Sequence, residues 1–473
     1  LDELKDDTTT EGIPPELEHQ EIAIQNTPAE PEKISFPAGP FSLTLETAIQ
    51  TALSHNPDLA IIRSSEPASR AAYHVADTYP YNPQFQTQVL PYTRDKEGND
   101  APVSQQHVII QTFELAHQQR YRTGGAAATW EQVRSKIRSA ELLSRAQTQR
   151  LFFTALYQRD LRDQAQSLTK LNEGMVGILE RRLKAGQANS ADVALAKLQM
   201  QSAHRQQRLT EANYQTALMS LRNYINLPEE IDVKLESRWL DINWNSMADI
   251  VRYPDGLSFN QGTHNNSAFE ASLRSLVRER PDVSAAYFAI TAARENLSLA
   301  NANRTPNLQA GPMWQRDDSA TQFWGIQAQI NIPVINTGTP LVRQRRAEYQ
   351  QQLITAQQME QKAFLEARAA IRRYERARKL VEQSRGEFAQ SIPDVLKPFE
   401  DQFKAGQIPL LQVFAFRTSL AQSRQSYLDL LNELAQSAAD VTLATGLPTN
   451  QLITNAPTPM PPTPSNSIEM KRQ

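Results

Sequence analysis

The sequence contains no cysteine, which excludes disulfide bonds, thiolate zinc sites and a cysteine nucleophile among these residues. No acylated cysteine is expected among them either. It lacks an excess of either charge, because 49 basic and 52 acidic residues give a formal net charge of -3. This balance provides no overall field for binding nucleic acid or an anionic lipid surface. We therefore expect no nucleic-acid partner.

Long hydrophobic runs are also absent, since no apolar stretch approaches the roughly 18 residues of a membrane-spanning helix. The first residues, Leu1 to Leu4, lack the basic and apolar regions of a signal peptide. The chain is therefore expected either to be soluble or to cross a membrane as strands, with any signal already removed.

Signatures of the common enzyme classes are missing as well. The sequence has no His-Glu-x-x-His, no glycine-rich phosphate loop and no Gly-x-Ser-x-Gly. Its seven histidines and eight methionines are scattered and form no recognisable metal relay. We expect neither enzymatic activity nor a metal or cofactor site.

What the sequence does contain is an internal repeat between two tails. Residues 1–40 are acidic and proline-rich, and residues 449–473 are proline-rich, so both ends are predicted to be tails. The first repeat spans 41–228 and the second 273–448, with an insert at 229–272. Three pairs of motifs match, each 220 to 224 residues apart. They are Lys184-Ala185-Gly186-Gln187 with Lys404-Ala405-Gly406-Gln407, Leu227-Pro228 with Leu447-Pro448, and Asn56-Pro57-Asp58 with Arg280-Pro281-Asp282.

Each repeat contains a long segment of helical pattern. Residues of about 115–183 contain no proline and carry apolar residues at helical spacing, which predicts a helix about 100 Å long. The second repeat has a matching segment at about 341–391, and alanine-rich helices of this length usually pack as coiled coils. Return helices are predicted at about 191–224 and 410–445. The glycines of the two turns, 184–187 and 404–407, then lie at helix ends.

Each repeat also contains a predicted β-hairpin, at about 84–113 and about 307–333, where the pattern changes to a two-residue period. One face is expected to be apolar and consists of Phe85, Val89, Trp314, Trp324, Ile326 and Ile330. The other face carries uncharged amides and consists of Gln84, Gln86, Gln88, Gln327, Gln329 and Asn331. An amide face suits the water-filled lumen of a wide barrel, and an apolar face suits lipid.

Polar loops join the strands at 94–100 and 316–319, with Tyr92, Trp314, Phe323 and Trp324 near them in the positions of a membrane aromatic girdle. Four strands cannot close a barrel, and an open edge cannot face lipid. Several chains must therefore share one barrel. The alternative is a small soluble sheet covered by helices, but both hairpins interrupt the helical pattern at equivalent places.

The order of these features resembles the TolC family of outer-membrane channels, over about residues 40–448. The motifs that carry the resemblance are Leu43 to Ile49 with Asn56-Pro57, the segment Ile330-Asn331-Ile332-Pro333-Val334, and Tyr427 to Gly446. Phe113-Glu114-Leu115 and the Ala-Gly-Gln turn before Leu410 are similar to the heavy-metal resistance branch of the CzcC or CusC type.

The resemblance implies an α+β membrane protein that forms a homotrimer. Four strands from each chain make a transmembrane β-barrel of twelve strands, which a tunnel of long helices continues into the periplasm. Residues 229–272 and the tails would surround the middle of the tunnel. A periplasmic adaptor and an inner-membrane pump are the implied partners, with outer-membrane lipid around the barrel, and the implied function is passive conduction in a tripartite efflux system.

The resemblance also assigns roles to the helical tip. The turns 184–187 and 404–407 match the positions that meet the adaptor, although each is also explained as a simple turn glycine beside a solvated lysine. Family members often carry carboxylates six residues beyond that glycine, where the tunnel narrows. Asp192 matches this position, whereas the second repeat has Gln412 there and Ala415 nearby, and Asp192 is equally explained by the dipole of its own helix.

Another expectation comes from the residues. Pro393 and Pro398 predict a kink near the end of the second long helix, because proline removes a backbone donor.

Two other functions compete with that of a channel. One is a soluble or periplasmic coiled-coil adaptor or scaffold, and the other is a hydrolase within 229–272, for whose acidic residues no partner base is evident.

Overall fold

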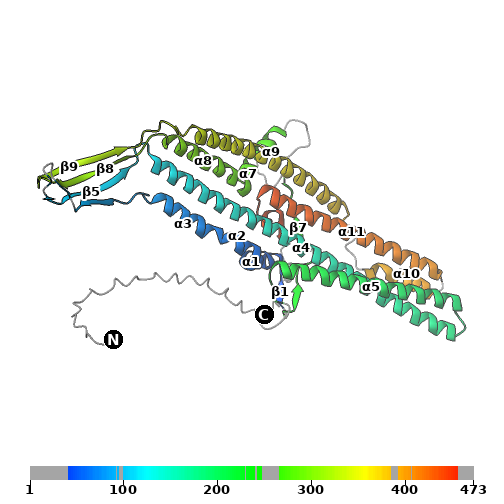
Figure 1. The fold of residues 1–473 in the computed structure, drawn as a ribbon. Helices are drawn as coiled ribbons and strands as arrows, with labels where there is room; N and C mark the ends of the chain where they lie inside the picture. The colour runs from blue at the N-terminus through cyan, green and yellow to red at the C-terminus, as the bar shows by residue number, and fades with distance from the viewer. Residues whose placement is uncertain are drawn as a thin grey trace, which may run out of the picture.

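The computed structural model describes residues 41–91, 93–94, 98, 100–228, 231–239, 242–247, 266–384, 392–405 and 407–455. The molecule is elongated, with a β-sheet at one end and helices that run lengthwise to the other end (Figure 1). This arrangement separates a sheet end from a helical tip.

The sheet at one end contains the two predicted hairpins. Its strands are β2 (Gln84–Leu90), β5 (Ser104–Phe113), β8 (Leu308–Arg316) and β9 (Gln322–Ile330), in the order β2-β5-β8-β9. All neighbouring pairs are antiparallel, and the two hairpins join through β5 and β8. The short strands β3 (Thr93–Arg94) and β4 (Asp100–Ala101) pair near the first loop.

The helices follow a similar order in the two repeats. The first repeat has α1 (Leu45–His55), α2 (Pro57–Arg63) and α3 (Ser65–Asp77) before its hairpin, then α4 (Gln118–Lys184) and the return helix α5 (Ser190–Tyr224). The second has α7 (Asn266–Glu279) and α8 (Pro281–Ala302), then α9 (Thr339–Ser384), α10 (Ile392–Lys404) and the return helix α11 (Leu410–Thr445). The 67-residue α4 matches the predicted long helix closely.

The second long helix is described as two segments, α9 and α10. The residues between them, 385–391, lie outside the described part of the chain, so the predicted kink stays a prediction. Pro393 lies in the first turn of α10, where the missing backbone donor is not needed. Pro398 lies inside α10.

Equivalent hydrogen bonds close both repeats. Asn56 Nδ2 donates to the carbonyl of Tyr224 at the end of α5, at 2.9 Å. At the matching position, Arg280 Nη1 donates to the carbonyl of Ala444 at the end of α11, at 3.0 Å. Both residues precede a proline that begins a helix. The repeat seen in the sequence is therefore a repeat of contacts as well as of motifs.

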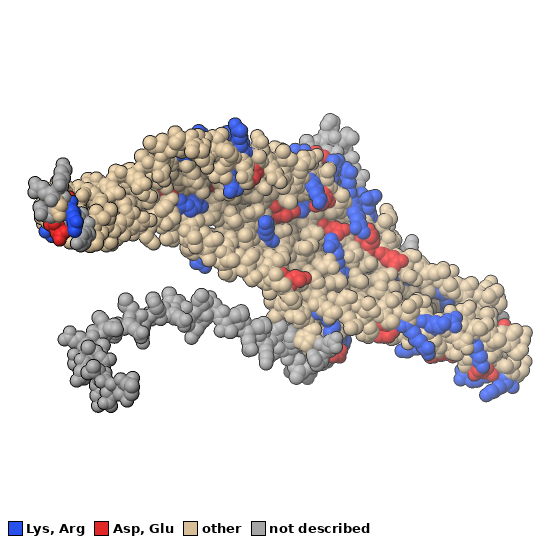
Figure 2. Space-filling view, viewed as in Figure 1, with Lys and Arg blue, Asp and Glu red and all other residues tan. Residues whose placement is uncertain are grey.

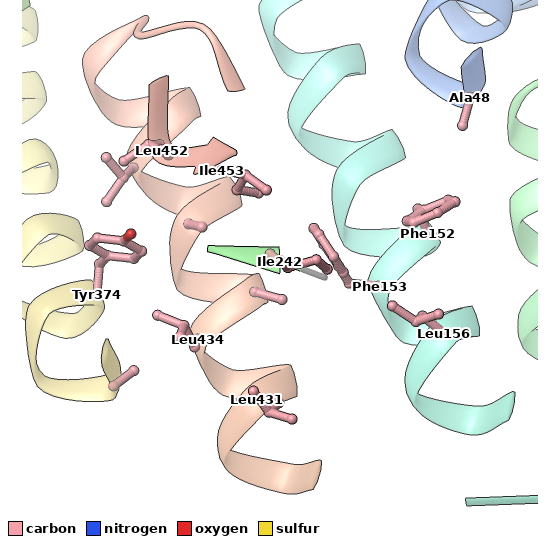
Figure 3. Close-up of a cluster of buried hydrophobic side chains, with 14 of the residues drawn as sticks. Ala48, Phe152, Phe153, Leu156, Ile242, Tyr374, Leu431, Leu434, Leu452 and Ile453 are labelled. Carbon is pink, nitrogen blue, oxygen red and sulfur yellow. The ribbon is translucent and has the colours of Figure 1, made fainter. Parts of the chain in front are cut away.

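The main hydrophobic core lies around the middle of the molecule. Phe152 and Phe153 of α4, Leu434 of α11 and Tyr374 of α9 are fully buried there (Figure 3). Two small sheets add to it. The strand β1 (Phe41–Leu43) pairs in parallel with β6 (Val233–Leu235), and β7 (Ile242–Trp244) pairs with β10 (Ile453–Asn455).

The C-terminal tail begins later than predicted. Residues 449–455 form α12 (Thr449–Leu452) and β10, and Leu452 is fully buried in the core. The physical reason is that the proline-rich composition begins only at Pro457, whereas Leu452 and Ile453 are apolar and reach the core (Figure 3). Part of the segment assigned to a tail thus belongs to the middle of the molecule.

The two closing bonds should differ in strength. Arg280 is 7% exposed and also pairs with Asp282 at 2.7 Å, so its replacement leaves a carbonyl and a carboxylate without their partner. We expect Arg280→Ala to lower the free energy of unfolding by about 2–4 kcal/mol, and Asn56→Ala by about 1–2 kcal/mol through the lost helix cap. Thermal unfolding in detergent measures both, with the exposed Arg372→Ala as control. Equal melting temperatures for Arg280→Ala and the control would contradict this assignment.

Candidate functional site: the strand sheet and the helical tip

The strand register separates two faces of the sheet. Thr87 lies in one row with His107, Trp314 and Trp324, because each is opposite the next in the register. The remaining residues predicted to be apolar, Phe85, Val89, Ile326 and Ile330, have the same parity and share this face, which we call the apolar face. The opposite side, the amide face, carries Gln84, Gln86, Gln88, Gln327 and Gln329.

Two predicted positions differ in detail. Asn331 lies outside the sheet, because β9 ends at Ile330, whose partner Leu308 is the first residue of β8. Phe323 pairs with Gln315 and so lies on the amide face, apart from the aromatic Trp314 and Trp324. Tyr92 lies outside the described residues.

The apolar face is exposed in the single chain. The exposed fractions are 80% for Ile326, 79% for Trp324 and 66% for Phe85. Soluble proteins rarely expose an extended apolar patch of such side chains on one face. Arg316, at the loop end of β8, is the only Lys, Arg, Asp or Glu in the four strands. Figure 2 shows the uncharged band between the loops and the helices.

An aromatic row crosses the apolar face near the loops. The ring of His107 stacks between Phe85 and Trp314, with ring centroids 5.9 and 5.3 Å apart, and Trp314 lies opposite Trp324. The Nδ1 of His107 and the hydroxyl of Thr87 are 2.8 Å apart. This row gives the loop end of the face the amphipathic aromatic character found where membrane proteins meet the water interface.

The second hairpin ends in a tightly bonded loop. The Asp317 carboxylate accepts hydrogen bonds from the Ser319 hydroxyl at 2.7 Å and from the backbone amides of Ser319 and Thr321, both at 2.9 Å. These bonds, that of the Ser319 hydroxyl first, lower the pKa of Asp317. The loop therefore stays charged and polar next to an apolar sheet, which favours an aqueous position for it.

Both edges of the sheet are open. The outer strands β2 and β9 each pair on one side only, among the residues that the structure describes. Unpaired edge amides and carbonyls are tolerated in water but are costly in hydrocarbon. A single chain therefore presents a face suited to lipid together with edges that lipid does not tolerate.

At the opposite end, the first tip turn is a complete helix C-cap. Gly186 has φ +71°, the Gly186 amide donates to the Leu183 carbonyl, and the Gln187 amide donates to the Arg182 carbonyl at 2.8 Å. In the second turn the Gln407 amide donates to the Gln402 carbonyl at 2.9 Å, the equivalent bond. Gly406 itself and the side chain of Lys404 lie outside the described residues.

The structure brings the two tip turns together. A second hydrophobic cluster joins α4 and α5 to α10 and α11, with Met175, Val193, Phe403 and Val413 among its buried members. Residues 184–187 are exposed, as are Ala405 and Gln407. Basic groups gather here too, because Lys197 pairs with Glu180 at 2.8 Å and Arg182 lies 5.2 Å from the centroid of the Phe403 ring.

The two constriction candidates occupy equivalent places. Asp192 lies in the first turn of α5, which is capped by the Asn189 side chain, and it is half-buried. Gln412 lies in the first turn of α11 and is exposed. The geometry is compatible with both explanations of Asp192, a tunnel constriction and a residue favoured by the helix dipole.

Sequence reasoning missed an ionic network between three helices. Arg150 of α4 pairs with Asp440 of α11 at 2.6 Å, and Arg373 of α9 pairs with Asp440 at 2.8 Å and with Glu433 at 2.6 Å. The hydrogen bond from Arg373 lowers the pKa of Glu433. No sequence signal marks this network, because Arg150 and Asp440 are separated by 290 positions.

Within the part of the chain that the structure describes, no group of three or more His, Cys, Asp or Glu side chains is placed to hold a metal ion. None of the helices described is both long and apolar enough to cross a lipid bilayer.

Comparison with known proteins agrees with this geometry. The family model "Outer membrane efflux protein" matches residues 273–447. The cation efflux system protein CusC of Escherichia coli K12 is 23% identical over 422 residues, covering 85% of this chain and 86% of the relative. The pyoverdine export protein OpmQ of Pseudomonas putida is 23% identical over 281 residues, 57% of this chain and 54% of the relative.

Solved structures show the same fold. A CusC structure aligns with a TM-score of 0.64 at 18% identity, covering 88% of this chain and 97% of that one. The open state of the MtrE channel of Neisseria gonorrhoeae aligns with a TM-score of 0.62 at 18% identity, covering 85% and 88%. The fold is thus that of an outer-membrane channel. The part of the chain from 273 to 447 thus matches the outer-membrane efflux protein family, and the chain as a whole has the fold of the TolC-type channels.

The tip turn yields a test with a matched control on the same helix. Gly186→Ala places a Cβ in the left-handed region and should destabilise the end of α4 by about 1–2 kcal/mol. Gly174 lies inside α4, and no atom lies within 4 Å of the position that a Cβ would take there, so Gly174→Ala should instead stabilise the helix by about 0.5–1 kcal/mol. Amide hydrogen exchange near residue 184 measures both effects. Changes of the same sign would contradict the capping assignment.

Proposed function

We propose that three copies of this chain form the outer-membrane channel of a tripartite efflux system and conduct solutes passively. The observation that carries this proposal is the sheet, whose exposed apolar face and amide face lie between two open edges. Closure with two further copies removes every edge, places the apolar face against lipid and directs the amides toward the lumen.

The helices would continue this barrel as a tunnel. In one chain the rods lie side by side, with α3 and α5 packed on one flank of α4, α8 and α11 on its other flank, and α9 beyond these. The helix α3 leads into the outer strand β2, and α9 follows the outer strand β9. The closure that pairs β9 with a neighbouring β2 therefore also brings α9 next to the neighbouring α3. The chain itself then catalyses no reaction.

The tip turns are the proposed adaptor contacts. Their described residues, 184–187, 405 and 407, are exposed, and the two turns lie together at the end remote from the sheet. We assign this contact to residues 184–187 and 404–407, with Asp192 and Gln412 at the narrowing of the tunnel. Adaptor docking and the pump behind it would open this end.

The conducted solute is proposed to be chosen mainly by the pump. The relatives differ in this respect, since one is named for cation efflux and another for pyoverdine export. The amide face carries no Lys, Arg, Asp or Glu in the described strands, so it offers no charge filter. Small polar solutes of either charge, metal ions and drugs included, fit such a lumen.

Neighbouring residues of β9 test the two faces. We expect Ile326→Lys to place a charge in lipid, at a cost of about 2–4 kcal/mol near the bilayer midplane, and so to reduce the trimer recovered from the outer membrane. Gln327→Lys should assemble normally and make single channels more selective for anions, which a shift of the reversal potential in a salt gradient measures. Immunoblots of outer-membrane fractions and planar-bilayer recordings measure these outcomes. The proposal fails if Gln327→Lys blocks assembly while Ile326→Lys is tolerated.

The tip can be tested by cross-linking, because the chain has no native cysteine. Asp192→Cys combined with Gln412→Cys, joined by a bifunctional thiol reagent, should abolish efflux while leaving the amount of assembled trimer unchanged. The uncross-linked double variant and each single variant treated with the reagent are the controls. Undiminished export after complete cross-linking would refute a gate at this position.

A further inference from the structure

A second interaction surface lies on the helix side of the sheet, where the last strand leads into α9. The connecting residues Ile332, Val334 and Ile335 are 75%, 82% and 98% exposed, and Leu341 in the first turn of α9 is 40% exposed. Such highly exposed branched apolar side chains lie close together in the chain and continue from Ile330 of the apolar face, which indicates an interface rather than an ordinary surface.

Three exposed arginines lie on the helix side of these residues. Arg343 and Arg346 lie near the start of α9, and Arg304 lies between α8 and β8. The side chain of Arg304 packs against the start of α9, because its Cγ is 3.1 Å from the position that a Cβ would take at Gly338. Figure 2 shows Lys and Arg side chains over the sheet-side part of α9.

These arginines have no evident intramolecular role. Among the described residues, none of the three has an acidic side chain within ion-pair distance, whereas their neighbour Arg345 pairs with Glu348 at 2.7 Å. Helix stability does not explain them either, because the start of a helix favours acidic residues and the first turn of α9 has none. Three unpaired guanidinium groups beside an exposed apolar segment therefore call for an anionic partner.

We propose that Ile332, Val334, Ile335, Arg304, Arg343 and Arg346 form a lipid collar that binds the phosphate groups of anionic phospholipids in the periplasmic leaflet of the outer membrane. This inference rests on the proposed channel function, which places the sheet in that membrane. The apolar side chains enter the leaflet, and the arginines, which bind phosphate oxygens in bidentate fashion, lie at the level of the headgroups.

A neighbouring copy is the competing occupant. Asp77, the last residue of α3, is exposed and lies at the same end of the helices, on the opposite flank of the chain. Asp77 offers one carboxylate for three arginines. The exposed side chains of Val75 (75%) and Tyr79 (40%) on the same flank can pack against part of the apolar segment, but they leave the positive charge unmatched. Anionic lipid matches both the positive charge and the apolar segment, so lipid is the occupant that the observations favour.

The test is a titration of the detergent-solubilised trimer with phosphatidylglycerol, with binding followed by native mass spectrometry. Each arginine near a membrane surface contributes about fivefold to affinity for anionic lipid. We therefore expect Arg343→Gln with Arg346→Gln to weaken phosphatidylglycerol binding about 25-fold, and Arg304→Gln, on a different segment, to weaken it about fivefold. Phosphatidylcholine should bind equally to all variants.

The matched control is Arg372→Gln with Arg376→Gln, two exposed arginines on the same helix, about 44 Å farther along. This control should bind phosphatidylglycerol like the unaltered protein. Equal binding by the Arg343 and Arg346 double variant would overturn the proposal. The proposal would also be overturned if the arginine variants lose the trimer without lipid and Asp77→Asn causes the same loss, because the arginines would then bind a neighbouring copy. It would be overturned as well if soluble glycerophosphate saturates the site at the same concentration as the lipid. Failure of the channel proposal would be visible separately, as absence of conductance in every variant.

Discussion

Everything in this structure depends on the need of a β-sheet to pair its edges. The sheet of one chain has an exposed apolar face and two unpaired outer strands. An exposed apolar face is unfavourable in water, and unpaired strand edges are unfavourable in lipid. Only a closed barrel shared between chains meets both conditions. The proposed trimer, its tunnel and its position in the outer membrane are all consistent with that single requirement.

The duplication explains how one chain places both hairpins at the same end. Each repeat begins with helices, enters a hairpin, returns along a long helix and turns at a glycine-containing tip. Asn56 and Arg280 close their repeats onto equivalent carbonyls, so the two repeats fold back on themselves in the same way. The hydrophobic core at the middle then fixes the repeats side by side, so that strands meet strands and turns meet turns.

Much of this architecture was predictable from the sequence, because its signals are periodic. The long α4, the hairpins and the glycine turns each depend on local chemistry. The register places Gln84, Gln86 and Gln88 on one side of β2 and Phe85 and Val89 on the other, whereas the lipid and lumen roles of these sides remain predictions. Channel function was predicted from resemblance and agrees with the family match, whereas the scaffold and hydrolase alternatives find no support in the comparisons. The adaptor and constriction residues remain predictions.

What the sequence could not provide depends on contacts between distant positions. The burial of Leu452 and Ile453 reflects pairing of β10 with β7, some 210 residues earlier, and composition alone assigned them to a tail. The end of β9 at Ile330 is determined by where β8 begins. The Arg150, Asp440 and Arg373 network joins three helices and has no local signature. The balanced overall charge likewise concealed the local excess of arginine in the lipid collar.

The central claim is that several chains share one membrane barrel, and the most direct test is fractionation of cell membranes followed by sizing in mild detergent. The account predicts recovery from the outer membrane as a trimer that separates into single chains on heating, since only paired strand edges hold the barrel together. Recovery of a monomer from the water-soluble fraction would contradict it and would leave the coiled-coil scaffold as the better description of this chain.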